Sequence, residues 1–143
     1  MAEKGGFAVI EGKHGRTERS SRDGKPLISI VDDDESIRIG TASLIRSLGF
    51  AVGSFPSAEA FLKADEPDRS CCMISDVKMP GMSGLEMVRR LRALPCLLQV
   101  IFVSAWNLEE VCREVIALGN SIILVKPLVA ERLSVALETV WDK

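Results

Sequence analysis

Four polar sites scattered along the sequence carry residue types that together can transfer a phosphoryl group. They are the acidic run Asp32-Asp33-Asp34 and the single residues Asp76, Ser104 and Lys126. Carboxylates brought close together repel one another, and a hard divalent cation such as Mg²⁺, which prefers carboxylate oxygens and water, removes that repulsion. A lysine and a hydroxyl beside them would bind phosphoryl oxygens. The set therefore supplies a nucleophilic carboxylate, a metal site and an oxyanion site.

Each of these sites directly follows a short apolar segment with the pattern of a buried strand. Five such segments are predicted, at residues 27–31, 51–55, 71–75, 99–103 and 122–125. Helical periodicity predicts helices at residues 35–48, from 57, and at 85–94, 108–118 and 128–141, with a loop at 79–84. Asp34 is expected to start the first helix, and Ser57 to cap the second.

This alternation of strands and helices predicts the α/β class, with a doubly wound, five-stranded parallel sheet and helices on both faces. In open sheets of this kind, ligands bind beyond the carboxyl ends of the strands. The predicted fold therefore gathers Asp32, Asp33, Asp76, Ser104 and Lys126 at one edge of the sheet.

The composition is that of a globular protein, since 47% of the 143 residues are hydrophobic and 27% are charged. Residues 1–25 are rich in Gly, Ser and charged residues, so we predict a flexible N-terminal extension there and one domain over residues 26–143. The net charge of -2 does not favour nucleic-acid binding. Because the sequence has neither an apolar run of about 20 residues nor a secretory signal, a cytoplasmic location is expected.

Metal or redox chemistry based on cysteine is not expected. The four cysteines (Cys71, Cys72, Cys96 and Cys112) form no CxxC pair, and the single histidine, His14, lies in the predicted extension. Neighbouring residues on a strand point to opposite faces, so Cys71 and Cys72 are not expected to share a ligand. We expect reduced thiols.

Four motifs, each at a predicted strand end, resemble those of the response regulator receiver domain over residues 27–141. They are Val31-Asp32-Asp33, Ser75-Asp76-Val77-Lys78-Met79-Pro80-Gly81-Met82-Ser83-Gly84, Val103-Ser104-Ala105 and Val125-Lys126-Pro127. Each motif alone is weakly specific, but all four in this order are specific. The resemblance implies the flavodoxin-like strand order 2-1-3-4-5. It also implies a signalling switch of a two-component phosphorelay.

The resemblance implies roles for four residues around the metal. Asp76 is the expected phosphoacceptor, which receives its phosphoryl group from a histidine kinase or a histidine phosphotransfer protein. Asp33 and Asp76 are expected to bind Mg²⁺ directly, and Asp32 to bind it through a water molecule. The backbone carbonyl of Lys78 is the expected third protein ligand.

The resemblance also implies roles for two residues around the phosphoryl group. Ser104 supplies a hydroxyl that moves toward it, and Lys126 supplies a cation that binds it, with the Lys126–Pro127 bond cis. Such a domain catalyses only its own phosphorylation and dephosphorylation, so it is not an enzyme acting on other substrates. An output protein or a second receiver is the expected downstream partner, and direct binding to nucleic acid or membrane is not expected.

Two other functions remain open from the residues alone. One is a degenerate receiver that binds proteins without phosphorylation, although the intact acids, serine and lysine argue against it. The other is a phosphatase of the haloacid dehalogenase type, since residues 32–34 match its Asp-x-Asp spacing, but no segment is long enough for its lid domain. A dinucleotide-binding domain is excluded because no GxGxxG motif follows the first strand.

Several positions depart from the family pattern, and two of them bear on signalling. Ile123 stands where an aromatic residue is usual, and the bulky Trp106 lies two residues after Ser104. Because a β-branched side chain has few χ1 states and no ring to turn inward, we expect signalling to depend on displacement of the loop from Ser104 to Leu108.

Overall fold

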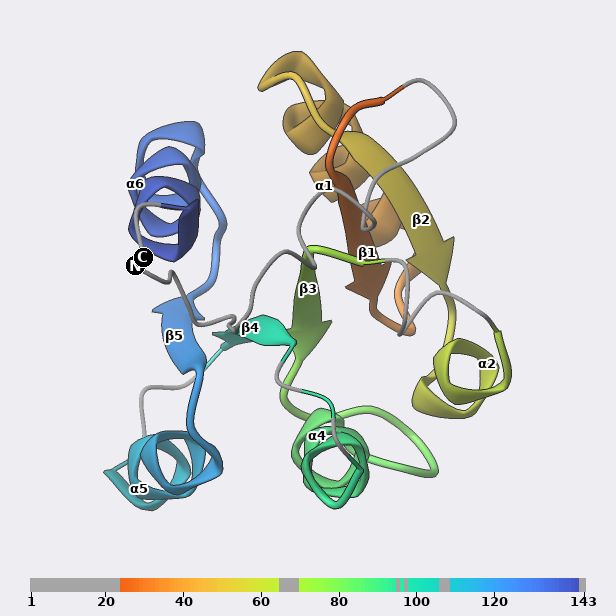
Figure 1. Cartoon of the computed structure of the whole chain (residues 1–143), viewed down its shortest axis with the longest axis vertical. Helices are drawn as coiled ribbons and strands as arrows, with labels where there is room; N and C mark the ends of the chain where they lie inside the picture. The colour runs from red at the N-terminus through yellow and green to blue at the C-terminus, as the bar shows by residue number, and fades with distance from the viewer. Residues whose placement is uncertain (1–23, 65–69, 95, 97, 106–108, 142–143) are drawn as a thin grey trace.

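The computed structural model describes residues 24–64, 70–94, 96, 98–105 and 109–141. Within these residues, five strands form one parallel sheet in the order β2-β1-β3-β4-β5, which confirms the predicted fold class (Figure 1). The strands are β1 (Leu27–Val31), β2 (Ala51–Phe55), β3 (Cys72–Asp76), β4 (Gln99–Ser104) and β5 (Ser121–Val125). The predicted N-terminal extension lies outside the described residues, except for its last two positions.

Helices cover both faces of the sheet. They are α1 (Glu35–Ser47), α2 (Ala58–Lys63), α4 (Gly84–Arg92), α5 (Glu109–Leu118) and α6 (Ala130–Trp141). Helices α1 and α6 lie on one face, and α2, α4 and α5 on the other (Figure 1). None of these described helices is long and apolar enough to cross a membrane.

The three central strands β1, β3 and β4 are buried on both faces, and their side chains belong alternately to two hydrophobic clusters. In β3, Cys72 and Ile74 belong to the cluster under α1 and α6, whereas Met73 belongs to the cluster under α2, α4 and α5. Burial on both sides explains why the strands read as apolar runs rather than as alternating patterns. Since each fully buried aliphatic side chain contributes about 1.5–3 kcal/mol, the strand ends that carry the polar residues rest on a firmly packed support.

The predicted elements are confirmed, with shifts of one or two residues at several ends. Strand β3 begins and ends one residue later than predicted, so Asp76 is its last residue, and β4 likewise includes Ser104. Helix α4 begins at Gly84, inside the predicted loop, because the Ser83 hydroxyl accepts a hydrogen bond of 3.1 Å from the Glu86 N–H and caps the helix one residue earlier. Helix α6 begins two residues later than predicted.

The two predicted helix starts are confirmed. The side chain of Asp34 accepts a 3.1 Å hydrogen bond from the N–H of Ile37 at the start of α1. The Ser57 hydroxyl does the same for the N–H of Ala60 at the start of α2, also at 3.1 Å. Caps of this kind contribute about 1 kcal/mol each. Asp34 therefore caps the helix, and of the three consecutive acids only Asp32 and Asp33 can contribute to the edge of the sheet.

The β3–α4 loop closes tightly on the end of β3 at Gly84. The Gly84 N–H donates to the Val77 carbonyl at 2.9 Å, and a Cβ atom at Gly84 would overlap the backbone oxygen of Asp76. A larger residue there would displace the strand end that carries the expected phosphoacceptor.

We predict that Gly84→Ala lowers the free energy of unfolding by about 1–3 kcal/mol, because backbone atoms must move to admit the methyl group. Urea denaturation followed by circular dichroism measures the change. Gly40→Ala is the matched control: Gly40 lies in α1 with open space around its Cβ position, so alanine should be neutral or stabilising there. Equal stabilities of the Gly84→Ala variant and the wild type would contradict the prediction.

Candidate functional site

The residues singled out from the sequence come together at the carboxyl edge of the sheet. Asp32 follows β1, Asp76 ends β3, Ser104 ends β4 and Lys126 follows β5. The parallel register pairs Val31 with Ser75, Asp76 with Val103 and Ser104 with Val125, so these strands end side by side. Together with Asp33, these residues come from four separate segments of the sequence. The strands place all five at one edge of the sheet, as the strand pattern predicted.

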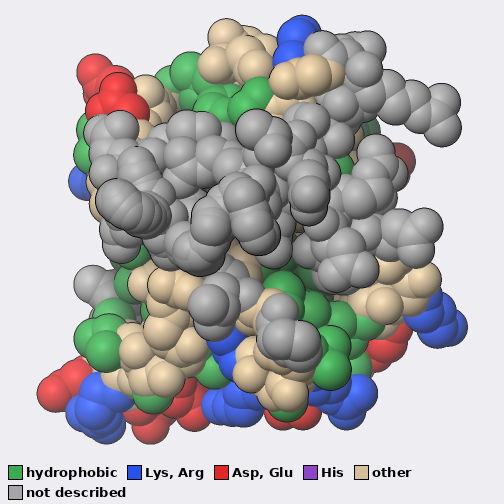
Figure 2. Space-filling view, viewed as in Figure 1, with side chains coloured by type: hydrophobic (Ala, Val, Ile, Leu, Met, Phe, Trp, Pro, Cys, Tyr) green, Lys and Arg blue, Asp and Glu red, His purple; other side chains and the backbone are tan. Residues whose placement is uncertain are grey.

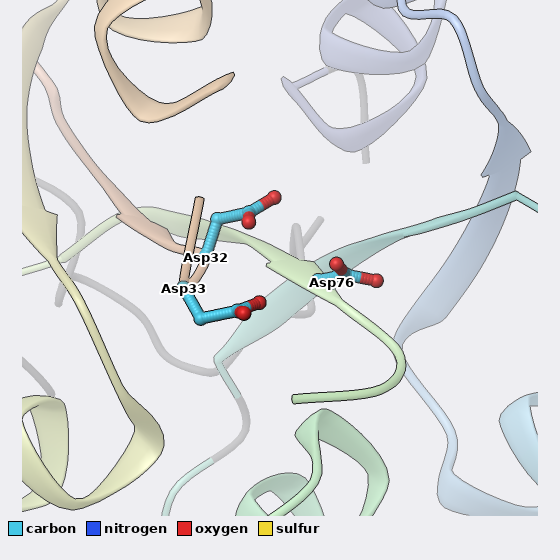
Figure 3. A group of neighbouring side chains, drawn as sticks. All are labelled: Asp32, Asp33 and Asp76. Carbon is cyan, nitrogen blue, oxygen red and sulfur yellow. The ribbon is translucent and has the colours of Figure 1, made fainter. Parts of the chain in front are cut away.

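Three carboxylates form the centre of the site. One oxygen from each of Asp32, Asp33 and Asp76 can be chosen such that all three lie within 4.8 Å of one another. Figure 3 shows the Asp32 and Asp33 side chains reaching from the end of β1 toward Asp76 on β3. Asp32 is buried, Asp33 is exposed and Asp76 is partly buried. The cluster therefore opens to solvent on the side of Asp33.

Asp32 is the most confined of these acids. Burial raises the pKa of its carboxyl group, and the negative charges of Asp76 and Asp33 raise it further. A hydrogen bond of 2.9 Å from the Asp34 N–H and the positive charge of Lys126 act in the opposite direction. Charge on Asp32 is thus costly in the metal-free chain, as expected for a carboxylate that lacks a nearby cation of sufficient charge.

Lys126 supplies positive charge from the β5 side. Its Nζ atom donates to Oδ2 of Asp76 at 3.1 Å and lies 3.9 Å from Oδ2 of Asp32. Its backbone N–H donates to the Ser104 carbonyl at 2.8 Å, and the Lys126–Pro127 peptide bond is cis, as predicted. One ammonium group beside three carboxylates leaves a net negative site.

Ser104 on β4 and Lys78 in the loop after β3 both lie close to Asp76. Ser104 is buried at the end of β4, one register position beyond the residue that pairs with Asp76. Lys78 follows β3 by two residues, its side chain is exposed, and its N–H donates to Oδ1 of Asp76 at 3.4 Å. The backbone of Lys78 therefore runs past the carboxylate, as a carbonyl ligand would require. Trp106 lies outside the described residues.

Arg38 is a neighbour of the site that the sequence reasoning missed. From the first turn of α1, its Nη1 atom donates to the backbone carbonyl of Asp32 at 2.8 Å. This bond fixes the turn between β1 and α1, from which the carboxylates of Asp32 and Asp33 project. In the sequence, the contact is indicated only by a basic residue one helical turn after the capping acid. Such a residue on a helix is equally consistent with a side chain that lies in solvent.

The donor set fits a hard divalent cation. Among the described residues, the group of potential metal-ligating side chains close enough to share an ion consists of Asp32, Asp33 and Asp76, which offer only oxygen atoms. Oxygen ligands with an open, solvent-facing side suit Mg²⁺, which retains several of its waters. Cys72, by contrast, is fully buried, and burial raises the pKa of its thiol. A protonated, buried thiol is a poor metal ligand.

The strand order and the site together define a flavodoxin-like α/β domain with an acidic site at the carboxyl ends of β1 and β3. Residues 28–138 match the family model of the response regulator receiver domain. The chain belongs to this family, the receiver domains of two-component signalling systems.

Relatives in sequence are response regulators. The chain is 37% identical over 100 residues to the transcriptional regulatory protein FixJ of Azorhizobium caulinodans, a match that covers 70% of this chain and 47% of FixJ. It is 38% identical over 118 residues to the response regulator protein TmoT of Ectopseudomonas mendocina, covering 82% of this chain and 53% of TmoT. The chain thus spans about half the length of the curated relatives it matches.

Solved structures agree with this assignment. The chemotaxis protein CheY4 of Vibrio cholerae superposes with a TM-score of 0.75 at 28% sequence identity, over 81% of this chain and 98% of CheY4. The response regulator StyR superposes with a TM-score of 0.71 at 35% identity, over 80% of this chain and 58% of StyR.

We predict that Asp32→Asn raises the melting temperature of the EDTA-treated chain at neutral pH by a few degrees. The amide has nearly the same shape and still accepts from the Asp34 N–H, but it removes a buried negative charge that faces two other acids. Asp34→Asn is the control, because asparagine caps helices as well as aspartate does. A melting temperature of Asp32→Asn below that of the wild type would show that repulsion does not dominate this cluster.

Proposed function

We propose that the chain is a phosphorylation-dependent switch that accepts a phosphoryl group on Asp76, with Mg²⁺ bound beside it. The observation that supports this most directly is the surroundings of the Asp76 carboxylate. Two further acids share a possible ion with it, and the ammonium group of Lys126 lies 3.1 Å from its Oδ2 atom. A structural salt bridge would need the lysine alone, whereas phosphoryl transfer needs both the acids and the lysine.

The chemistry assigns a separate task to each side chain. An oxygen of Asp76 attacks the phosphorus of a phosphohistidine, an O–P bond forms, the N–P bond breaks and the imidazole leaves with the electron pair. Lys126 pairs with a phosphoryl oxygen in place of Asp76 Oδ2, and the Ser104 hydroxyl donates to another. Asp33, Asp76 and the Lys78 carbonyl would hold Mg²⁺, and Asp32 would contact the ion through a water molecule. When bound, the ion would supply positive charge that offsets the negative charge between the nucleophile and the phosphoryl group.

The phosphodonor is proposed to be a histidine kinase or a histidine phosphotransfer protein. A cavity of about 550 Å³ opens directly beside Asp76, between α1 and the turn after β5. Much of its lining is apolar or uncharged; these residues include Ile37, Gly40, Thr41, Leu44, Pro127 and Leu128. A protein surface with a complementary apolar side chain could dock there and present its phosphohistidine to Asp76. Such a lining would contribute little binding energy to a small phosphorylated metabolite.

The output is proposed to be read by a partner protein or by a second copy of the domain. Relatives such as FixJ are named as transcriptional regulators, and each is about twice the length of the aligned region. On β5, the partly buried Ile123 packs against the cluster under α2, α4 and α5 and also lines a cavity of about 440 Å³ against α6. Ile123 thus sits in apolar packing, which supports the expectation that it does not act as a rotating switch.

The two alternatives make different predictions for the same assays. The match to the receiver family and the strand order favour a receiver over a haloacid dehalogenase-type phosphatase, which would turn over small phosphate esters. A degenerate receiver would keep the fold but take no phosphoryl group. The presence of Asp76, Lys126 and the acidic pair in one site favours the active form.

We predict that incubation with acetyl phosphate and Mg²⁺ adds one phosphoryl group to the chain, as seen by intact mass. Asp76→Asn should add none, because the amide is not a nucleophile for phosphorus. Asp34→Asn, which keeps the capping group outside the cluster, should be labelled like the wild type. Labelling that persists in Asp76→Asn would refute the assignment of the phosphoacceptor.

We predict that Mg²⁺ raises the unfolding free energy, because it binds a site that exists only in the folded chain. At 100 times the dissociation constant the gain is about 2.7 kcal/mol. Asp33→Ala should lose most of this gain, since it removes the exposed carboxylate of the cluster. Thermal melts with MgCl₂, compared with NaCl at equal ionic strength, measure it. The same gain in the wild type and in Asp33→Ala would place the metal elsewhere.

A further inference from the structure

The β3–α4 loop carries the carbonyl of Lys78, so its geometry bears directly on metal binding. Backbone hydrogen bonds hold both of its ends: the Val77 N–H donates to the Val103 carbonyl at 3.1 Å, and the Gly84 N–H donates to the Val77 carbonyl at 2.9 Å. Between these ends, Met79 belongs to the cluster under α2, α4 and α5, and the partly buried Met82 packs against it. Apolar packing is not directional, so it leaves the orientation of the intervening peptide groups open.

Glu59 supplies a directional contact to this part of the loop. It lies in the first turn of α2, and its Oε2 atom accepts a hydrogen bond of 3.2 Å from the N–H of Met82, 23 residues further along the chain. Gly81 turns the loop there with a φ of 75°, and a Cβ atom at Gly81 would lie 3.0 Å from the same carboxylate oxygen. The turn and the carboxylate are therefore fitted closely to each other.

An acidic residue in the first turn of a helix has an ordinary explanation, because it interacts favourably with the helix dipole. That explanation does not require the carboxylate to reach another segment. Here one oxygen is directed at a backbone N–H of the loop that follows the expected phosphoacceptor. The contact joins α2, which contributes no residue to the acidic cluster, to the loop that passes Asp76.

We propose that Glu59 is a positioning residue for metal binding: by accepting from the Met82 N–H it fixes the turn at residues 79–83 and, through it, the carbonyl of Lys78. This inference rests on the proposed function, in which that carbonyl is a ligand of Mg²⁺. Mg²⁺ requires nearly ideal octahedral geometry. A ligand on a loosely held loop therefore binds it more weakly.

The expected effect is moderate. Residues that orient metal ligands typically change affinity by about 10- to 100-fold when they are removed. Glu59 is exposed and acts through four residues of backbone, so we expect Glu59→Ala to weaken Mg²⁺ binding by about 3- to 10-fold. Glu59→Gln should remain within about twofold of the wild type, because its amide oxygen still accepts from the Met82 N–H.

Two measurements on the full chain test the proposal. Titration calorimetry with MgCl₂ gives the dissociation constant, and NMR hydrogen exchange of the Met82 amide, without metal, reports on the contact itself. We expect weaker binding and faster exchange in Glu59→Ala, and values near those of the wild type in Glu59→Gln. Lys63→Ala, an exposed substitution on the same helix, controls for nonspecific effects on α2.

The outcomes separate the proposal from its rivals. Unchanged Mg²⁺ affinity in Glu59→Ala overturns it. Equal weakening in Glu59→Ala and Glu59→Gln also overturns it, because the charge of Glu59 rather than its hydrogen bond would then be responsible. If the wild type binds Mg²⁺ but takes no phosphoryl group, the proposed function fails while the role of Glu59 is still decided by the affinities of the variants. If the wild type binds no Mg²⁺, both fail.

Discussion

Repulsion among three carboxylates at one edge of a parallel sheet is the interaction on which the rest of the site depends. Asp32, Asp33 and Asp76 are brought within reach of one ion because β1 and β3 are neighbours and end at the same level. Only one ammonium group, that of Lys126, is paired with them among the described ion pairs. The folded chain thus holds an excess of negative charge in a partly buried place, which makes a divalent cation a stabilising ligand.

A charged cluster of this kind stays in place only if its supports are rigid. The strands beneath it are buried on both faces, and the turn carrying Asp32 and Asp33 is fixed by Arg38, whose guanidinium donates to the Asp32 carbonyl at 2.8 Å. At the end of β3, Gly84 allows the loop to close directly on the backbone of Asp76. The site is therefore positioned by the hydrophobic core that holds the strands and by polar contacts in the turns that follow them.

The α/β class and the meeting of the central acids could be predicted from the sequence because both follow from local pattern, whereas the strand order was implied by the family resemblance. Buried strands read as apolar runs, and parallel strands necessarily place the residues at their carboxyl ends together. Arg38 and Glu59 could not be predicted in the same way, since each contacts the backbone of another segment. Such contacts depend on the direction of a long side chain in three dimensions, and neither periodicity nor residue type encodes it. The start of α4 at Gly84 was missed for a related reason: a capping serine inside a glycine-rich motif reads as loop.

Lys126 connects the chemistry of the site to the edge of the sheet. It follows β5, which pairs with β4 on one side only and whose residues are all partly buried. Its ammonium group contacts Asp76, while its backbone N–H donates to the carbonyl of Ser104 at the end of β4. In the proposed function, a phosphoryl group on Asp76 draws on both of these residues at once, because it needs the cation of Lys126 and the hydroxyl of Ser104. The strand whose end would adjust is thus a partly buried strand at the edge of the sheet. A change of charge at Asp76 would reach the surface formed by β5 and its flanking helices through Lys126 and Ser104, which a 2.8 Å hydrogen bond joins.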